Sequence, residues 1–247
     1  MRIHEIQTKT ALVRSKLNPQ GFVLNPYLGC THGCRYCYAV FMRKYAHLNR
    51  HTRWGEFVEV KANIAEVLHK ELTRKRKTSS VMLSSVCDPY QPVEGRYKLT
   101  QQCIALLREF GWAVRILTRS PLVLRDLELL RTTLDLTVGL SIPTDDDHIR
   151  RITEPHAPPI ARRVDTLRQL HEAGIRTWVF VAPILPMDPE RLHAMIHEHA
   201  DDVQFDALNY RSQVAPLFRQ HGWHDALTDA YAEQTESQLR RLLAAGQ

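Results

Sequence analysis

The sequence predicts an α/β fold in which six parallel strands, each followed by a helix, form a partial (β/α)6 barrel. Short apolar segments rich in β-branched residues alternate along the chain with longer segments of helical periodicity. Two predicted strands, 81–86 and 179–184, are apolar nearly throughout, as is typical of parallel strands covered on both faces. A closed eight-unit barrel needs about 250 residues, and six units already use most of these 247. Periodicity alone leaves a doubly wound sheet as the alternative.

The first half of the chain supplies two of these units. The first predicted strand is 22–24, which ends at an Asn-Pro pair. A helix is predicted at 63–75, because apolar residues recur there every three or four positions. The next strand is 81–86, and the helix after it, 100–109, is followed by a glycine that ends it. The segment 44–60 shows no periodicity and is expected to be an irregular loop.

The second half continues the same alternation. Pro121 begins one helix and Gly174 follows the end of another, which are the positions that these residues prefer. Strands are predicted at 113–117, 136–142, 177–184 and 203–208, and helices at 121–134, 160–172, 189–199 and 225–243. We expect an N-terminal extension (1–20), a core barrel (21–210) and a C-terminal helical segment (211–247) that is mostly one helix.

Composition and charge indicate the class of protein. Hydrophobic residues make up 44% of the chain and charged residues 24%, which excludes a disordered or fibrous protein. The longest apolar segment, 177–185, is about half the length of a membrane-spanning helix. The N-terminus lacks the apolar region of a secretory signal, so we expect a soluble, cytoplasmic protein without a membrane partner. The formal charge of +6 suits a nucleic-acid partner without requiring one.

The five cysteines of the chain are unevenly distributed. Cys30, Cys34 and Cys37 form a loop directly after the first strand, while Cys87 and Cys103 are isolated. An odd number of cysteines without an export signal favours a metal or reactive-thiol site over disulfides. The loop also follows the carboxyl end of a strand, which is where parallel sheets and barrels bind ligands. We expect Cys103, within an apolar helical pattern, to belong to the core.

Two kinds of metal site fit this loop. Structural zinc normally takes four protein ligands in paired spacings, and a second pair is missing, although His32 or Cys87 could complete the site. Iron–sulfur clusters are normally held by four cysteines, so three ligands on a cubane would leave one iron open to a further ligand.

The C-x3-C-x2-C loop, with an aromatic residue before its last cysteine, resembles the radical S-adenosylmethionine (SAM) superfamily, which has a TIM-like partial barrel. The segment 25–39, Asn-Pro-Tyr-Leu-Gly-Cys-Thr-His-Gly-Cys-Arg-Tyr-Cys-Tyr-Ala, resembles its branch around spore photoproduct lyase. Further resembling segments are 88–94, 117–120, 125–126 and 154–158. The resemblance implies a [4Fe-4S] cluster on the three cysteines and SAM on the fourth iron. One electron then cleaves SAM to a 5′-deoxyadenosyl radical, which abstracts hydrogen.

The resemblance also implies a binding site for SAM. Tyr36 matches the aromatic residue near the adenine, and Cys87 and Asp88 match the residues near the amino group. Arg119 stands where this branch usually has Lys, and a guanidinium can bind the carboxylate through two bonds. Ser141 matches a hydroxyl that reaches the ribose or the carboxylate. The alternatives are that Asp88, before a proline, is only a turn residue, and that Arg119 is a solvated charge.

The same resemblance raises the question of a hydrogen donor. Spore photoproduct lyase uses a cysteine near the end of its second strand to return hydrogen to the product. The best register places Ser85 at that position. Cys87 stays a candidate, because a shift of two residues keeps a side chain on the same face of a strand.

The expected function is therefore that of a radical SAM enzyme that abstracts hydrogen, acting as a carbon–carbon lyase on a nucleic-acid base lesion. One alternative is a radical SAM enzyme that modifies a peptide or a small metabolite, which the short C-terminal segment favours. A second alternative is a non-enzymatic module that binds zinc or a cluster. The resemblance implies an electron donor of the flavodoxin or ferredoxin type, and it does not indicate the oligomeric state.

Overall fold

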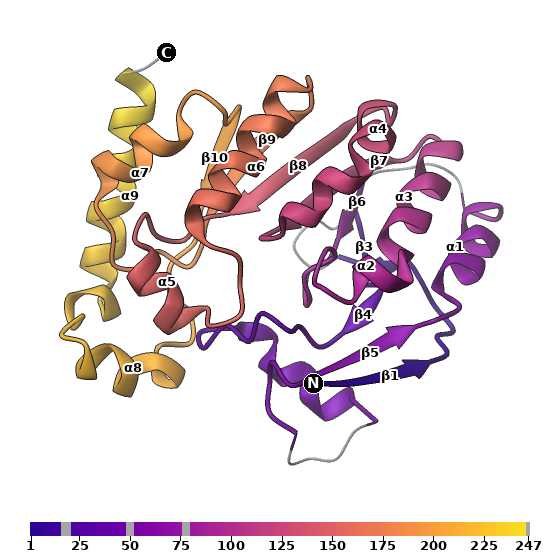
Figure 1. The fold of residues 1–247 in the computed structure, drawn as a ribbon, viewed down its shortest axis with the longest axis horizontal. Coiled ribbons are helices and arrows are strands. Elements are labelled where there is room, and N and C mark those ends of the chain that lie inside the picture. The colour runs from indigo at the N-terminus through magenta and orange to yellow at the C-terminus, as the bar shows by residue number, and fades with distance from the viewer. Residues whose placement is uncertain (16–20, 48–51, 76–79, 246–247) are drawn as a thin grey trace.

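A seven-stranded sheet forms the centre of the computed structural model, which describes residues 1–15, 21–47, 52–75 and 80–245 (Figure 1). Its strand order is β10-β9-β8-β7-β6-β3-β2. The six parallel strands are β3 (Phe22–Leu24), β6 (Ser80–Leu83), β7 (Ala113–Thr118), β8 (Leu136–Ser141), β9 (Arg176–Val181) and β10 (Asp202–Phe205). The short β2 (Val13–Arg14) pairs with β3 in the antiparallel direction.

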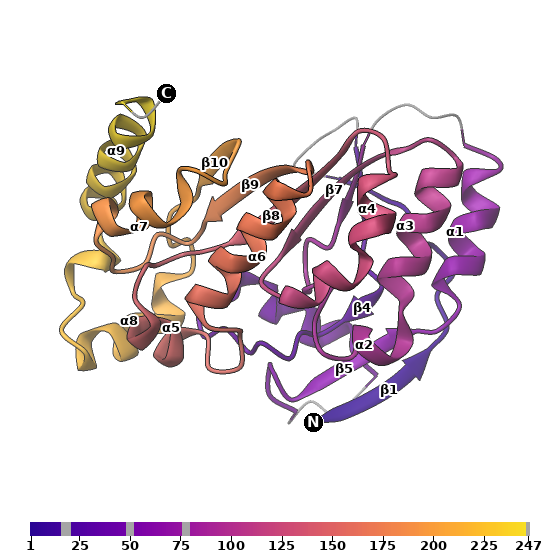
Figure 2. The same cartoon turned by 45° about the horizontal axis from the view of Figure 1, so that its top comes forward.

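The parallel strands lie in the sheet in the order in which they occur in the chain. The helices that connect them therefore lie on one face, as the two views show (Figures 1 and 2). They are α1 (Ile64–Leu72), α3 (Leu99–Glu109), α4 (Leu127–Arg131), α6 (Ile160–Glu172) and α7 (Pro189–Ile196). A doubly wound sheet would reverse its strand order and carry helices on both faces. The prediction of a partial barrel of six parallel strands is confirmed, and the doubly wound alternative is wrong.

The main hydrophobic core lies between this sheet and its helices. In β7 the side chains alternate, so that Val114 and Ile116 are buried while Arg115 and Leu117 are only half-buried. Leu107 of α3 and Leu167 of α6 are fully buried in the same core. Cys103 of α3 lies there too, which confirms its prediction as a core residue.

A second, smaller sheet consists of β1 (Arg2–Ile6), β5 (Phe57–Lys61) and β4 (Tyr27–Leu28), in the order β1-β5-β4. The prediction that 44–60 is irregular is wrong at its end, because β5 begins at Phe57; residues 48–51 lie outside the described residues. Glu59 interrupts the apolar pattern of β5 and yet is fully buried. Its carboxylate accepts a hydrogen bond from the backbone N–H of His47 at 2.5 Å.

Several predicted boundaries differ from the structure. The second strand ends at Leu83 instead of residue 86, because Ser84 adopts a left-handed conformation with φ +61°. The helix predicted at 121–134 begins as a 3-10 turn, Pro121–Asp126, and continues as α4. Two short helices were not predicted, α2 (Glu94–Tyr97) and α5 (Asp147–Thr153).

The C-terminal segment contains two helices and not mostly one. These are α8 (Arg211–Gln220) and α9 (Asp229–Ala245), joined through the 3-10 turn Asp225–Leu227. Pro216 lies inside α8, and a proline in a helix interior hides the helical signal from sequence patterns. Within the described ranges, no helix is long and apolar enough to cross a membrane.

Packing of Gly139 against Trp178 gives a test of the sheet. The two residues face each other in β8 and β9, and a Cβ built on Gly139 would lie 2.2 Å from Trp178 Cε2. We expect Gly139→Ala to lower the free energy of unfolding by roughly 1–3 kcal/mol, since the ring has to shift. The measurement is equilibrium unfolding in urea. Gly95→Ala in α2 is the control, because its Cβ would meet no atom closer than 3.9 Å. Equal stability of the two variants would contradict this packing.

Candidate functional site

The three cysteines lie in a tight loop between β4 and the 3-10 helix η1 (Tyr38–Tyr45). Cys30 and Cys34 are buried, Cys37 is half-buried, and all three are free thiols. The loop requires glycine at residue 33. Gly33 has φ +61° and packs against Gly55, whose own Cβ would lie only 2.9 Å from Gly33 Cα. The segment around Gly55 therefore lies directly on the cysteine loop.

Burial of the cysteines disfavours their thiolate form, while nearby positive charges favour it. Burial raises the pKa of the Cys34 thiol to about 12, although the positive charges of Arg119 and Arg163 act in the other direction. Burial likewise raises the pKa of Cys30, and the charges of Cys34 and Cys37 add to this effect. In the described part of the chain, no three His, Cys, Asp or Glu side chains converge as ligands of a single metal ion. A cubane does not require that convergence, because each cysteine binds a different iron.

Gln91 holds the loop on both sides of Cys30. Its Oε1 accepts a hydrogen bond from the Thr31 N–H at 3.0 Å, and its Nε2 donates to the Gly29 carbonyl at 3.1 Å. Gln91 is fully buried and belongs to the segment after β6. The side chain therefore fixes the backbone that carries the first cysteine. Sequence analysis assigned no role to Gln91, although it lies within the resembling segment 88–94.

Asp88 joins the same segment to the end of β7. Its Oδ1 accepts a hydrogen bond from Thr118 Oγ1 at 2.7 Å, and its Oδ2 accepts one from the Arg119 N–H at 2.8 Å. His32 Nε2, from the cysteine loop, lies 3.2 Å from the same Oδ2. Burial alone would raise the pKa of Asp88, but His32 and the hydrogen bonds outweigh it and lower the pKa. Asp88 Oδ1 also accepts a hydrogen bond from the Tyr90 N–H at 2.8 Å, so the side chain stabilises the turn in which it lies.

Glu154 is the centre of a buried charge network. Its Oε1 accepts hydrogen bonds from Arg119 Nε at 2.8 Å and from the Tyr36 hydroxyl, and its Oε2 accepts one from Arg163 Nη2 at 2.5 Å. Cys34 Sγ lies 4.0 Å from Oε1. Burial would raise the pKa of Glu154, but Arg163 and Arg119 outweigh it and lower the pKa to about 2. The network therefore binds the cysteine loop to the end of β7 and to α6.

Sequence analysis assigned no role to Glu154 or Arg163. The signal for Glu154 was its place at the start of the resembling segment 154–158. Arg163 lies within a regular helical pattern, where an arginine is normally exposed, and nothing in the sequence indicated that its side chain is fully buried.

Arg119 and Ser141, which both contact this network, each have one polar group without a hydrogen-bond partner among the described residues. Arg119 Nη2 lies 3.2 Å from the Tyr36 hydroxyl, the side chain is 19% exposed, and Nη1 has no hydrogen-bond partner among the described residues. The Ser141 hydroxyl is buried and also lacks a partner there, while its carbonyl accepts a bond from Arg163 Nη1 at 2.9 Å. Buried polar groups are normally hydrogen-bonded, so the unpartnered Ser141 hydroxyl and the free Arg119 Nη1 are each available to a polar ligand.

Ser85 and Cys87 lie beyond the strand and not within it. The argument that they share a strand face is therefore wrong, because β6 ends at Leu83 and the chain turns at Ser84. Asn25 caps the resulting loop: its Oδ1 accepts a hydrogen bond from the Ser85 N–H at 3.0 Å and lies 3.8 Å from Cys87 Sγ. Burial raises the pKa of the Cys87 thiol to about 11, against the opposing effects of Ser84 and Lys61.

The loop of Ser85 is also joined to the cysteine loop. The hydroxyl of Tyr38, the residue after Cys37, donates a hydrogen bond to the Ser85 carbonyl. The structure therefore brings all the predicted site residues to one end of the sheet. The three cysteines and Tyr36 lie in the loop, Ser85, Cys87 and Asp88 follow β6, Arg119 follows β7, and Ser141 is the last residue of β8.

The C-terminal helix α8 also packs against the cysteine loop. A second cluster of buried side chains contains Cys34 and Tyr36 of the loop, Ile149 of α5, and Val214 and Phe218 of α8. Part of the C-terminal segment is therefore needed to bury the loop.

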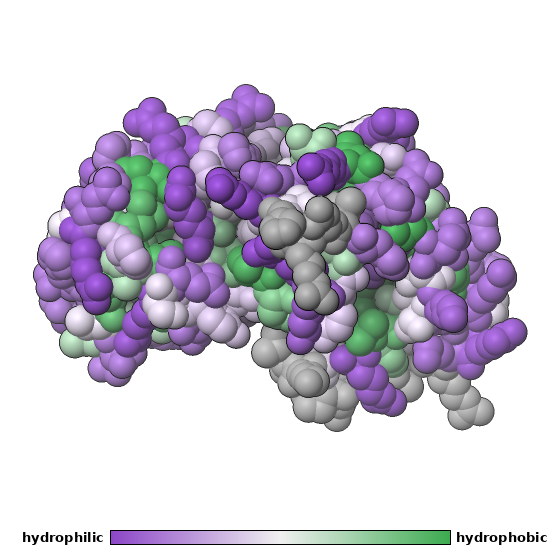
Figure 3. Space-filling model, turned by 90° about the horizontal axis from the view of Figure 1, so that it is seen from below, coloured by the Kyte–Doolittle hydropathy of each residue, from purple (hydrophilic) through white to green (hydrophobic). Residues whose placement is uncertain are grey.

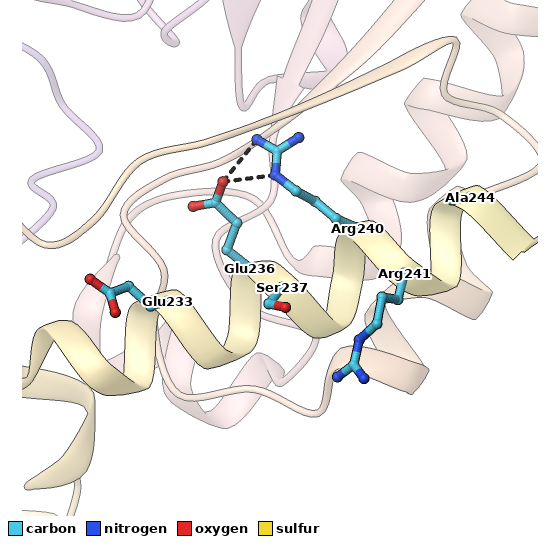
Figure 4. A pocket seen from close by; sticks show the side chains of 6 residues that line it. All are labelled: Glu233, Glu236, Ser237, Arg240, Arg241 and Ala244. Atoms are coloured by element: carbon cyan, nitrogen blue, oxygen red, sulfur yellow. Dashed lines mark hydrogen bonds and ion pairs between the residues drawn. The ribbon is translucent and has the colours of Figure 1, made fainter.

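A shallow hollow on α9 is separate from this site (Figure 4). Its lining residues all come from this one helix: Glu233, Glu236, Ser237, Arg240, Arg241 and Ala244. Arg240 Nε donates a hydrogen bond to Glu236 Oε1 at 2.8 Å, which is an ordinary pair of residues one helical turn apart. None of these residues belongs to the cysteine loop or to the ends of the parallel strands.

Comparisons with known proteins find a family model, related sequences and a similar fold. The model of the radical SAM superfamily matches residues 24–199. An uncharacterised protein of Methanocaldococcus jannaschii is 31% identical over 214 residues, which cover 86% of this chain and 80% of that protein. An uncharacterised protein of Mycobacterium tuberculosis is 35% identical over 190 residues, which cover 74% of this chain and 56% of that protein.

A solved structure of spore photoproduct lyase complexed with dinucleoside spore photoproduct has a similar fold. The TM-score is 0.67 and the sequence identity 16%, and the match covers 98% of this chain and 78% of that one. At this identity the likeness concerns the fold alone.

The buried pair of Glu154 and Arg163 gives a test of the network. We expect Glu154→Gln to lower the free energy of unfolding by about 3–5 kcal/mol, because it leaves the Arg163 guanidinium buried without its counter-charge. The pKa of Glu154 is about 2 in the folded protein against an ordinary 4.5. Its contribution is therefore complete above about pH 4.5 and is lost as the pH falls toward 2. Urea unfolding at several pH values measures both effects.

Glu128→Gln is the matched control. Glu128 pairs with Arg131 at 3.2 Å but its side chain is 82% exposed, so its loss should change stability by no more than about 0.5 kcal/mol. Similar losses in both variants would show that the Glu154 network does not stabilise the fold.

Proposed function

The chain belongs to the radical SAM superfamily, and from this membership we propose that it cleaves SAM reductively at a [4Fe-4S] cluster on Cys30, Cys34 and Cys37. The observation that carries the proposal is the group of three free cysteines in a loop whose backbone the Gln91 side chain holds in place. When bound, the cluster and SAM supply one-electron chemistry that produces a carbon radical able to abstract hydrogen. All other tasks fall to the residues of this chain.

Arg119 has the task of binding the SAM carboxylate. Its Nε is held by Glu154 and its Nη2 lies near Tyr36, so the guanidinium is already oriented and its free Nη1 remains for the ligand. Ser141 supplies a hydroxyl to the ribose or the carboxylate. Glu154 is a positioning residue in this scheme, because it acts on the ligand only through Arg119 and Tyr36.

Asp88, Cys87 and Tyr36 complete the proposed SAM site. Asp88 is ionised, and its negative charge favours a SAM ammonium group nearby. Its oxygens also bind Thr118 and the Arg119 backbone, so the position of this charge is fixed. Tyr36 is buried beside the cysteines, where its ring supplies a flat surface for the adenine.

Cys87 is a better candidate for a hydrogen-atom donor than Ser85. A thiol S–H bond is weaker than an alcohol O–H bond, so only the thiol readily gives up a hydrogen atom to a carbon radical. The pKa of about 11 keeps Cys87 protonated at neutral pH, which this role requires. Ser85 instead contributes its backbone to the loop, through Asn25 and Tyr38.

A nucleic-acid base is the proposed substrate class, with a carbon–carbon lyase reaction as in spore photoproduct lyase. The formal charge of +6 supports this class. The fold likeness to a lyase structure that contains a dinucleoside lesion supports it as well. An electron donor of the flavodoxin or ferredoxin type would reduce the cluster.

The cysteine assignment predicts the behaviour of two variants. Cys34→Ala should lose the brown colour of the anaerobically reconstituted protein and at least about 100-fold of its SAM cleavage, since a ligand is missing. Cys103→Ala is the control and should keep both, because Cys103 lies in the core. Iron content and 5′-deoxyadenosine formed with dithionite are the measurements. A colourless wild type with one stoichiometric zinc, or an unchanged cluster in Cys34→Ala, would refute the proposal.

The Arg119 assignment predicts a graded loss of SAM affinity. Arg119→Met should raise the Kd for SAM about tenfold or more, since a charge-assisted hydrogen bond to the carboxylate is lost. Arg119→Lys should lie between this variant and the wild type, because it keeps the charge. Equilibrium dialysis against the reconstituted protein measures both. Arg108→Met, on the exposed side of α3, is the control. The same affinity in Arg119→Met and wild type would exclude this role.

A further inference from the structure

The most exposed aromatic side chains of the described residues gather at one edge of the candidate site. Tyr38, Phe41 and Tyr45 are 44%, 46% and 57% exposed and lie on η1, directly after the last cysteine. Tyr210, which follows β10, is 46% exposed and lies near enough to Tyr38 to influence its ionisation. We name these four residues the aromatic edge. Exposed aromatic groups of this kind normally mark a binding surface.

Three positively charged side chains lie on or close to the segments that carry the aromatic edge and the cysteine loop. The Lys44 ammonium lies 4.8 Å from the ring centroid of Tyr45 and 6.0 Å from that of Phe41. Arg35, between two of the cysteines, and Arg53, close to the cysteine loop through Gly55, are exposed. Within the described ranges, none of these three cations has an ion-pair partner. Seen from below, the molecule shows separate hydrophobic areas on a mostly hydrophilic surface (Figure 3).

Rings and unpaired cations together fit one class of ligand. Single-stranded nucleic acid offers unstacked bases, which stack on aromatic side chains, and phosphates, which attract lysine and arginine. A duplex fits less well, because its bases are already stacked on one another.

The aromatic edge is also joined to the candidate site. The Tyr38 ring lies 6.4 Å from the Phe41 ring, and the Tyr38 hydroxyl donates a hydrogen bond to the carbonyl of Ser85, two residues before Cys87.

We propose that the aromatic edge binds single-stranded nucleic acid, with bases stacked on Phe41 and Tyr45 and phosphates near Lys44, Arg35 and Arg53. A nucleic-acid strand bound at the aromatic edge places the base next to the stacked ones at the loop of Cys87. The inference rests on the proposed function and deepens it, because it names the single-stranded form of the substrate and the surface that binds it. Its test measures binding and does not depend on cleavage of SAM.

The experiment is fluorescence anisotropy of a labelled 15-residue oligonucleotide with the reconstituted full chain, as single-stranded DNA, single-stranded RNA and duplex DNA. We expect a single strand to bind at least about tenfold more tightly than the duplex. Phe41→Ala and Tyr45→Ala should each weaken binding about tenfold, since one stacking ring is lost. Tyr45→Phe should bind as the wild type does, because it keeps the ring. The DNA and RNA arms show which strand is preferred.

Two further variants separate stacking from charge and from general effects. Lys44→Gln should reduce the slope of log Kd against log salt by about one, since one phosphate contact is lost. Leu134→Ala is the matched control for exposure: Leu134 is 81% exposed, lies between α4 and β8, and should bind as the wild type does. Circular dichroism verifies that each variant is folded.

The outcomes are distinguishable. Binding that is unchanged in both Ala variants, equal for single strand and duplex, or equally displaced by an unlabelled peptide would overturn this inference. The proposed function would stand in each of these cases if SAM is still cleaved. Loss of binding in Tyr45→Phe as well would show that the hydroxyl and not stacking is recognised, which also contradicts the inference. Absence of 5′-deoxyadenosine would refute the proposed function, whatever the oligonucleotide does.

Discussion

The ionised carboxylate of Glu154 is the interaction on which the site depends. Its partners belong to three separate parts of the chain: Tyr36 to the cysteine loop, Arg119 to the end of β7 and Arg163 to α6. A buried carboxylate is tolerated only when its charge is compensated. The two guanidinium groups therefore have to stay in place, and with them the elements that carry them. Arg163 extends this constraint to the end of β8 through the Ser141 carbonyl.

Asp88 and Gln91 hold the cysteine loop from the opposite side. Gln91 fixes the backbone around Cys30, and Asp88 lies against His32 and binds the backbone of Arg119. The loop is thus held both by polar contacts from the strand ends and by the apolar cluster that Cys34 and Tyr36 share with α5 and α8. The two buried carboxylates are compensated differently: Glu154 faces two guanidinium groups, whereas Asp88 accepts hydrogen bonds and lies against His32.

The sequence predicted the parts of the fold that follow from local patterns. The six parallel strands and the helices between them follow from periodicity, and the three cysteines follow from their spacing. The buried strand β5 escaped this reasoning, because Glu59 breaks its apolar pattern and is satisfied by His47, 12 residues away in the chain. The role of Glu154 escaped it as well, since its partner Tyr36 is 118 residues distant. Such pairs form only when the chain has folded, so a pattern of neighbouring residues does not indicate them.

The sheet stays open, with β10 and β2 as its two edges. In a closed barrel the strands surround the packed interior on all sides, and a ligand reaches the site only from above the carboxyl ends of the strands. An open arc can instead be approached from the side. A long chain molecule can then be engaged at an interior position and released without being threaded, and a unit in its middle is as reachable as one at its terminus.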